Sequence, residues 1–220
     1  MSFQFSKWTV LPSAVLLLGT VAMGQDTNTT STPTQGTTAS APATKPTIAQ
    51  RKENQQDRIA NGVKSGQLTP GKTANLEKKE AAINKETSAD RAANGGKLTP
   101  AEKAQVNQQQ NKLSKQIYND KHNANTAHYG NNKVGQRREN QQDRIAQGIK
   151  SGQLTPSETA KLEKQQQGIN EQVAGDRKAN GGSLTASEKK QINKEQNQAS
   201  RNIYRKKHNA ATQSNAKPKQ

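Results

Sequence analysis

A cluster of cations close to the end of the chain has the residue types and spacing of a binding surface. Arg201, Arg205, Lys206 and Lys207 lie within seven residues of one another. They fall at a predicted helix C-terminus, where the helix dipole favours positive charge. Crowded cations attract polyanions, among them nucleic acid, anionic lipid headgroups and acidic envelope polysaccharides. Lys115 and Lys121 form a weaker counterpart earlier in the sequence.

The charge of the whole chain allows two interpretations of this cluster. The sequence has 34 Lys and Arg against 17 Asp and Glu, a net charge of +17. Such an excess either recruits an anionic partner or keeps a protein with few apolar residues in solution. Aromatic residues make up only 3% of the chain, and no nucleic-acid reading motif is present. We therefore expect an anionic polymer or surface, or else a protein, as the partner.

A second candidate for chemistry is the segment Asp90–Glu102. Its second half, a glycine followed by Leu-Thr and a final Glu, resembles an EF-hand calcium loop. With Gly96 as the loop's invariant glycine, the positions of the first ligands are Arg91, Ala93 and Gly95, which offer no side-chain oxygen. A helix end followed by a Thr-capped helix explains the same residues. A degenerate calcium module is therefore kept as an alternative.

The sequence contains no recognisable catalytic or cofactor-binding set. It has no Cys and three His, and two of these, His122 and His208, occupy the same place in an internal repeat. A single His per repeat lacks the partners needed for a metal site. No glycine-rich phosphate loop follows a predicted strand. We expect a protein that is not an enzyme and that carries neither cofactor nor metal.

The elements that position these residues come from the internal repeat. With a shift of 86 residues, Arg51–Ala124 aligns without a gap on Arg137–Ala210, and 45 of 74 positions are identical. Each copy contains two Leu-Thr pairs, which are followed by the Pro or Glu typical of helix starts. The predicted N-cap residues are Thr69, Thr99, Thr155 and Thr185.

These signals predict an all-α fold of two tandem three-helix repeats, each with one shorter helix and two longer ones. Only 28% of the residues are hydrophobic, which predicts thin helical units rather than a thick globular core. Hydrogen bonds must then carry much of the stabilisation. The repeated Asp57-Arg58 and Asp143-Arg144 pairs are expected to form ion pairs or hydrogen bonds between helices.

Composition divides the rest of the chain. Lys7, an apolar run and the small-residue pair Ala22 and Gly24 predict a signal peptide over residues 1–24. The expected order then continues with a disordered Thr/Ser/Pro-rich linker at 25–47, repeat unit 1 at 48–124, a hinge at 125–136, repeat unit 2 at 137–210 and a disordered tail at 211–220. The apolar run is too short to span a bilayer comfortably. We expect an exported protein, periplasmic or extracellular, with no membrane anchor after cleavage.

Three motifs recur in both units: Ser-Gly-Gln-Leu-Thr-Pro, Asp-Arg-x-Ala-Asn-Gly-Gly-x-Leu-Thr and Ile-Tyr-x-x-Lys-His-Asn-Ala. In these motifs the chain resembles an uncharacterised family of secreted bacterial helical-repeat proteins, which implies an exported bacterial protein. The Leu-Thr-x-x-Glu helix starts are also similar to those of periplasmic helical chaperones of the Spy type. That second resemblance implies a chaperone-like role as a further alternative.

The cleavage site gives a first testable prediction. The mature chain should begin at Gln25, because Ala22 and Gly24 are the small-residue pair at the end of the apolar run. Intact-mass measurement of exported protein checks this directly. Exported material whose mass includes Trp8 would contradict the prediction.

Overall fold

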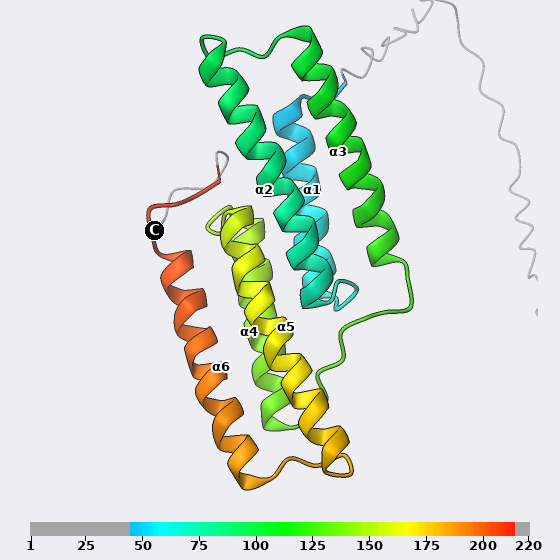
Figure 1. Cartoon of the computed structure of the whole chain (residues 1–220), viewed down its shortest axis with the longest axis vertical. Helices are drawn as coiled ribbons and strands as arrows, with labels where there is room; N and C mark the ends of the chain where they lie inside the picture. The colour runs from blue at the N-terminus through cyan, green and yellow to red at the C-terminus, as the bar shows by residue number, and fades with distance from the viewer. Residues whose placement is uncertain (1–44, 214–220) are drawn as a thin grey trace, which may run out of the picture. The chain divides into compact units, whose positions relative to one another are not determined.

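A computed structural model describes residues 45–213, which belong to one compact unit. The predicted signal peptide, most of the linker and the last residues of the tail lie outside the described residues. Six α-helices and no strand occur within this range, as expected for an all-α fold (Figure 1). They are α1 (Ile48–Lys64), α2 (Pro70–Ala93), α3 (Pro100–Lys121), α4 (Lys133–Lys150), α5 (Pro156–Ala179) and α6 (Ala186–Lys207). Within residues 45–213, none of the helices is both long and apolar enough to cross a membrane.

The threonines expected to start helices are N-caps. In α2, α3, α5 and α6 the cap hydroxyl accepts a hydrogen bond from the third backbone N–H of the helix; the caps are Thr69, Thr99, Thr155 and Thr185. In α3, α5 and α6 a Glu at that third position bonds back to the cap, which completes a capping box. α2 has Lys72 there and lacks the reciprocal bond.

The connection between the repeats is shorter than the hinge predicted at 125–136. α4 begins at Lys133, with Asn132 as its N-cap, so the last residues of that range are helical. The difference arises because the prediction began the second unit where sequence identity begins, at Arg137. Its first helix starts earlier, at Lys133, which is equivalent to Thr47, the N-cap residue of α1. At the C-terminal side, two residues of the predicted disordered tail form backbone hydrogen bonds: the Ala211 N–H donates to the Asn209 side chain, and the Gln213 N–H donates to the Gly152 carbonyl.

The recurrent Gly-x-x-Ser-Gly-Gln-Leu segment makes the turn after the first helix of each repeat. Leu68 folds back over Gly62, and its N–H donates to the Gly62 carbonyl at 2.9 Å. A Cβ on Gly62 would lie 2.7 Å from the Leu68 side chain, so any larger residue would displace this leucine. Gly66 adopts φ +73°, which favours glycine. Gly148, Gly152 and Leu154 repeat the arrangement at the end of α4.

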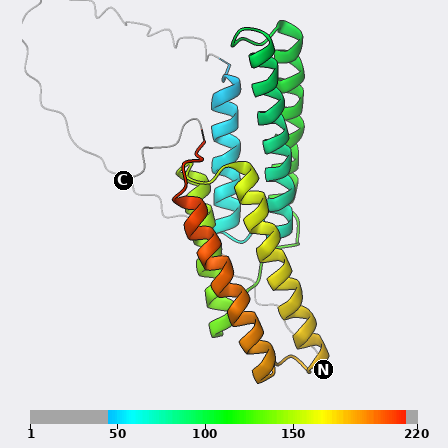
Figure 2. The same ribbon diagram turned by 60° about the vertical axis from the view of Figure 1, so that its left-hand side comes forward.

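The two repeats pack through equivalent helices. The most extensive contact between two helices is that of α2 with α5, and the next is that of α1 with α4 (Figures 1 and 2). One apolar cluster draws on both repeats, with Ile59, Leu76 and Ile117 from the first and Ile145 and Leu162 from the second. The core is therefore thicker than either thin repeat could form alone. α3 and α6 contact only helices of their own repeat.

Buried glutamines supply the hydrogen bonds that the low apolar content requires. Gln55 donates from Nε2 to the Gln110 carbonyl of α3 at 2.7 Å, and Gln110 donates to the Ile48 carbonyl at 3.0 Å. Gln141 and Gln196 form the same reciprocal link between α4 and α6, at 2.7 and 2.9 Å. Each third helix is thus fixed to the first helix of its repeat by amide-to-carbonyl bonds.

Three carboxyl groups with no exposed surface, those of Glu77, Glu80 and Glu163, lie on the paired helices α2 and α5. Gln56 donates to Glu77 at 3.1 Å, and the equivalent Gln142 donates to Glu163 at 2.9 Å. Burial raises the pKa of Glu163 to about 8 and that of Glu80 to about 7, and it raises the pKa of Glu77 well above its usual range. These groups are stable in the folded protein chiefly in their neutral, protonated form.

A dependence of stability on pH follows from these shifts. The pKa of Glu163 is higher when folded, about 8, than in the unfolded chain, about 4.5, so the folded state binds more protons between these values. The free energy of unfolding should therefore fall as pH rises from about 4.5 to about 8. Glu163→Gln should remove part of this fall, a few kcal/mol by order of magnitude.

Urea unfolding followed by circular dichroism at several pH values measures the effect. Glu171→Gln, an exposed change on the same helix α5, is the matched control and should keep the wild-type dependence. Equal pH dependence in wild type and Glu163→Gln would contradict the assignment of a raised pKa.

Candidate functional site

The candidate site lies at the C-terminal end of α6, where His208 is the C-cap and packs against Tyr204. The ring of Tyr204 stacks on His208 with centroids 4.2 Å apart, and His208 Nδ1 donates to the Tyr204 carbonyl at 2.7 Å. The same pair, Tyr118 and His122, closes α3 with centroids 4.1 Å apart. The repeated Ile-Tyr-x-x-Lys-His motif is thus a helix-terminating element. It leaves the Tyr204 ring 59% exposed.

Two of the predicted cations line a shallow hollow beside this tyrosine. The α6 hollow, as we call it, has a volume of about 550 Å³ and is lined by Arg144, Gln198, Ser200, Arg201, Tyr204 and Arg205. The Arg201 and Arg205 guanidinium groups bond to the amide oxygens of Gln198 and Asn202, at 2.7 and 2.6 Å. Because these oxygens are neutral and no lining residue is acidic, the hollow keeps its positive charge.

Arg144 reaches the α6 hollow from the neighbouring helix α4. Its guanidinium donates to the Ser200 hydroxyl at 2.7 Å and to the Ser200 carbonyl at 3.3 Å. Arg58 makes the equivalent bonds to Ser114 in the first repeat. The arginines of the Asp57-Arg58 and Asp143-Arg144 pairs therefore form hydrogen bonds between helices, one of the two roles expected for these pairs.

The two lysines that follow Arg205 do not line the hollow. Lys206 lies 3.9 Å from the carboxylate of Glu158 at the start of α5, which offsets its charge. Lys207 packs its stem over the Cα of Gly148. Partial burial and the nearby charge of Arg144 lower the pKa of Lys207. The four cations clustered in the sequence are thus divided between two sides of α6.

The predicted counterpart on α3 has fewer cations. Lys115 is exposed, and Lys121 packs over Gly62 as Lys207 packs over Gly148. The positions equivalent to Arg205 and Lys206 are Asn119 and Asp120. Lys115 and Lys121 are far along the chain from the cations of the second repeat, and neither lines the α6 hollow.

Sequence reasoning identified Arg201 and Arg205 but missed the other four residues that line the hollow, among them Arg144 and Tyr204. From the sequence, Arg144 was expected only to form contacts between helices. Its position in the hollow depends on how α4 packs against α6. Tyr204 follows the buried Ile203, and the 3.6-residue period of the helix, which turns the next residue to a different face, was the available signal that Tyr204 lies away from the core.

The loop that resembles an EF-hand uses its terminal carboxylate for helix capping. Glu102 accepts bonds from the Thr99 N–H and the Asn94 side chain, each at 2.8 Å, and these bonds contribute to a lowered pKa. Glu188 does the same with Thr185 and Asn180. Across residues 45–213, no cluster of three or more His, Asp or Glu is arranged to hold a metal ion.

Comparison with known proteins adds no relative: no family model, curated protein or solved structure matches the chain.

Calcium provides a test of the EF-hand resemblance. Because Glu102 already accepts from Thr99 and Asn94, calcium at about 1 mM, where extracellular calcium modules bind, should leave the melting temperature unchanged. Thermal unfolding with calcium, with magnesium and with EDTA measures this. A calcium-specific rise that Glu102→Gln abolishes would instead support a calcium module.

Proposed function

We propose that this chain is an exported binding protein, not an enzyme, and that it holds an anionic polymer through the α6 hollow. The observation that carries the proposal is the composition of that hollow. Arg144, Arg201 and Arg205 line it without an acidic residue, and the exposed Tyr204 lies among them. Arginine suits such a role because its planar group forms paired hydrogen bonds with phosphate, sulfate or carboxylate.

Two differences between the repeats favour the second one as the binding half. Arg201 and Arg205 are exposed, whereas Lys206 is paired with Glu158. In the first repeat, neutral Asn119 stands at the position of Arg205. We therefore assign the contact to Arg201 and Arg205, with Arg144 contributing charge from a fixed position.

The chaperone-like alternative has less support. A holdase for unfolded proteins needs apolar surface, and apolar patches on a monomer usually mark such interactions. Among the described residues, the large hydrophobic side chains that are exposed are Tyr118 and Tyr204, one on each repeat. Two separate tyrosines suit stacking or hydrogen bonding better than the capture of an extended apolar segment.

The proposal is tested by the salt dependence of binding to heparin and to a short single-stranded DNA. Binding by counterion release makes log affinity fall with log salt by about 0.7–0.9 per anionic group contacted. The double variant Arg201→Gln with Arg205→Gln should lower the slope by about 1.4–1.8. The matched control, Lys189→Gln with Lys190→Gln, removes the same charge from exposed positions near the start of α6 and should keep the wild-type slope.

Two further variants sharpen the result. Lys206→Gln should change the slope less than either arginine change, because Glu158 already pairs with Lys206. Tyr204→Ala should weaken binding to DNA more than binding to heparin, because DNA bases stack on aromatic side chains and heparin has no bases. If both double variants reduce the slope equally, only net charge matters and the α6 hollow is not the site.

A further inference from the structure

In both repeats, the segment that follows the third helix forms the same backbone hydrogen bond to the loop after the first helix. After α3, the Ala127 N–H donates to the Gly66 carbonyl at 2.8 Å. After α6, the Gln213 N–H donates to the Gly152 carbonyl at 2.9 Å. These residues are 86 apart, so they are equivalent in the repeat. Each of these segments therefore crosses the first loop of its own repeat and continues toward the other repeat.

Beyond this point, the connecting segment covers a surface of the second repeat with a tyrosine. The Arg138 guanidinium lies 5.2 Å from the centre of the Tyr129 ring, and its Nη2 donates to the Tyr129 carbonyl at 2.8 Å. Arg138 is itself fixed by a bond from Nη1 to Asn170 at 3.0 Å. A buried arginine thus binds both the ring and the backbone of this segment.

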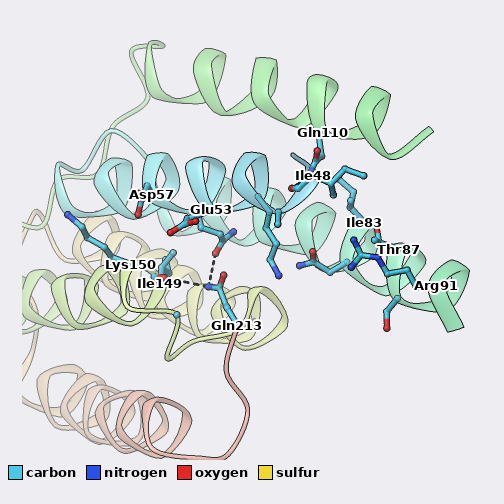
Figure 3. A pocket seen from close by; sticks show the side chains of 16 residues that line it. Ile48, Glu53, Asp57, Ile83, Thr87, Arg91, Gln110, Ile149, Lys150 and Gln213 are labelled. Atoms are coloured by element: carbon cyan, nitrogen blue, oxygen red, sulfur yellow. Dashed lines mark hydrogen bonds between the residues drawn. The ribbon is translucent and has the colours of Figure 1, made fainter. Parts of the chain in front are cut away.

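The equivalent surface of the first repeat is a groove of about 320 Å³ (Figure 3). Lys52, Asn84, Thr87 and Arg91 line it and are the counterparts of Arg138, Asn170, Val173 and Arg177. Gln213 also lines the groove, and its Nε2 donates to Gln56 at 3.1 Å and to the Leu154 carbonyl at 2.8 Å. The volume is at the lower end of the usual range for small-ligand pockets, about 300–1,000 Å³.

The chain does not provide this groove with a tyrosine of its own at the equivalent position. Where His128 and Tyr129 follow Ala127, the residues after Gln213 are Ser214 and Asn215. The groove retains a cation, Lys52, in the place of Arg138, and apolar walls from Ile48 and Ile83.

From this comparison within the molecule, we infer that the groove on the first repeat binds a tyrosine presented by an extended peptide of a partner protein. Lys52 would face the ring as Arg138 faces Tyr129. This site is separate from the α6 hollow and does not rest on the binding of an anionic polymer.

The test uses the full chain and a peptide copied from the segment that fills the second repeat. The probe is an acetylated, amidated peptide with the sequence of residues 125–130, Asn-Thr-Ala-His-Tyr-Gly. Calorimetry should show saturable binding to one site, and replacing the peptide's tyrosine (Tyr129→Ala) should weaken it at least about tenfold, because one desolvated cation–π contact is lost.

Chain variants locate the site. Asn84→Trp places a large side chain in the groove and should abolish peptide binding. Asn75→Trp, at an exposed position on the same helix α2, should leave it unchanged. The melting temperature of each variant shows that it is folded. Absence of saturable binding, or binding that Asn84→Trp does not reduce, overturns the inference.

Removal of residues 214–220 distinguishes the partner peptide from the chain's own tail. A peptide affinity that is unchanged by the deletion supports a groove open to a partner. An affinity that rises about tenfold or more means that the tail competes for the groove, and it overturns the assignment to a partner.

Discussion

The structure depends on hydrogen bonds from buried glutamine amides to backbone carbonyls of neighbouring helices. A core made only of apolar side chains would not need them. Gln55 and Gln110 exchange such bonds with α3 and α1, and Gln141 and Gln196 do so between α6 and α4. An amide removed from water without a partner destabilises the fold, so the helices are held at the one separation where each donor is satisfied. The position of the end of α6, and with it the α6 hollow, follows from this constraint.

The same constraint explains what could be predicted from the sequence. Helix starts depend on local chemistry, a threonine cap followed by proline or glutamate, and Thr69 and Thr185 are recognisable without any knowledge of packing. Burial of Gln55 and Glu77 is not recognisable, because polar residues on a helix usually face solvent. Counting apolar residues therefore underestimated the core, and it gave no indication that α2 would pack against α5.

The candidate site was predictable only in part, for a related reason. The cluster of Arg201, Arg205, Lys206 and Lys207 is visible in the sequence, yet adjacent residues on a helix point in different directions. The structure turns Lys206 toward Glu158 and places Arg144 beside Arg201. Proximity along the chain therefore included Lys206 and Lys207, which do not line the hollow, and missed Arg144 on α4, which does.

The pairing of α1 with α4 and of α2 with α5 brings the first two helices of each repeat against their own copies. Such an arrangement is the one found in twofold homodimers, where a single surface is complementary to itself. Here the two copies are joined by the short connection between α3 and α4, so each repeat has its partner at a high effective concentration. The association of the two halves is therefore independent of dilution, whereas a dimer of separate repeats would dissociate as the protein becomes scarce.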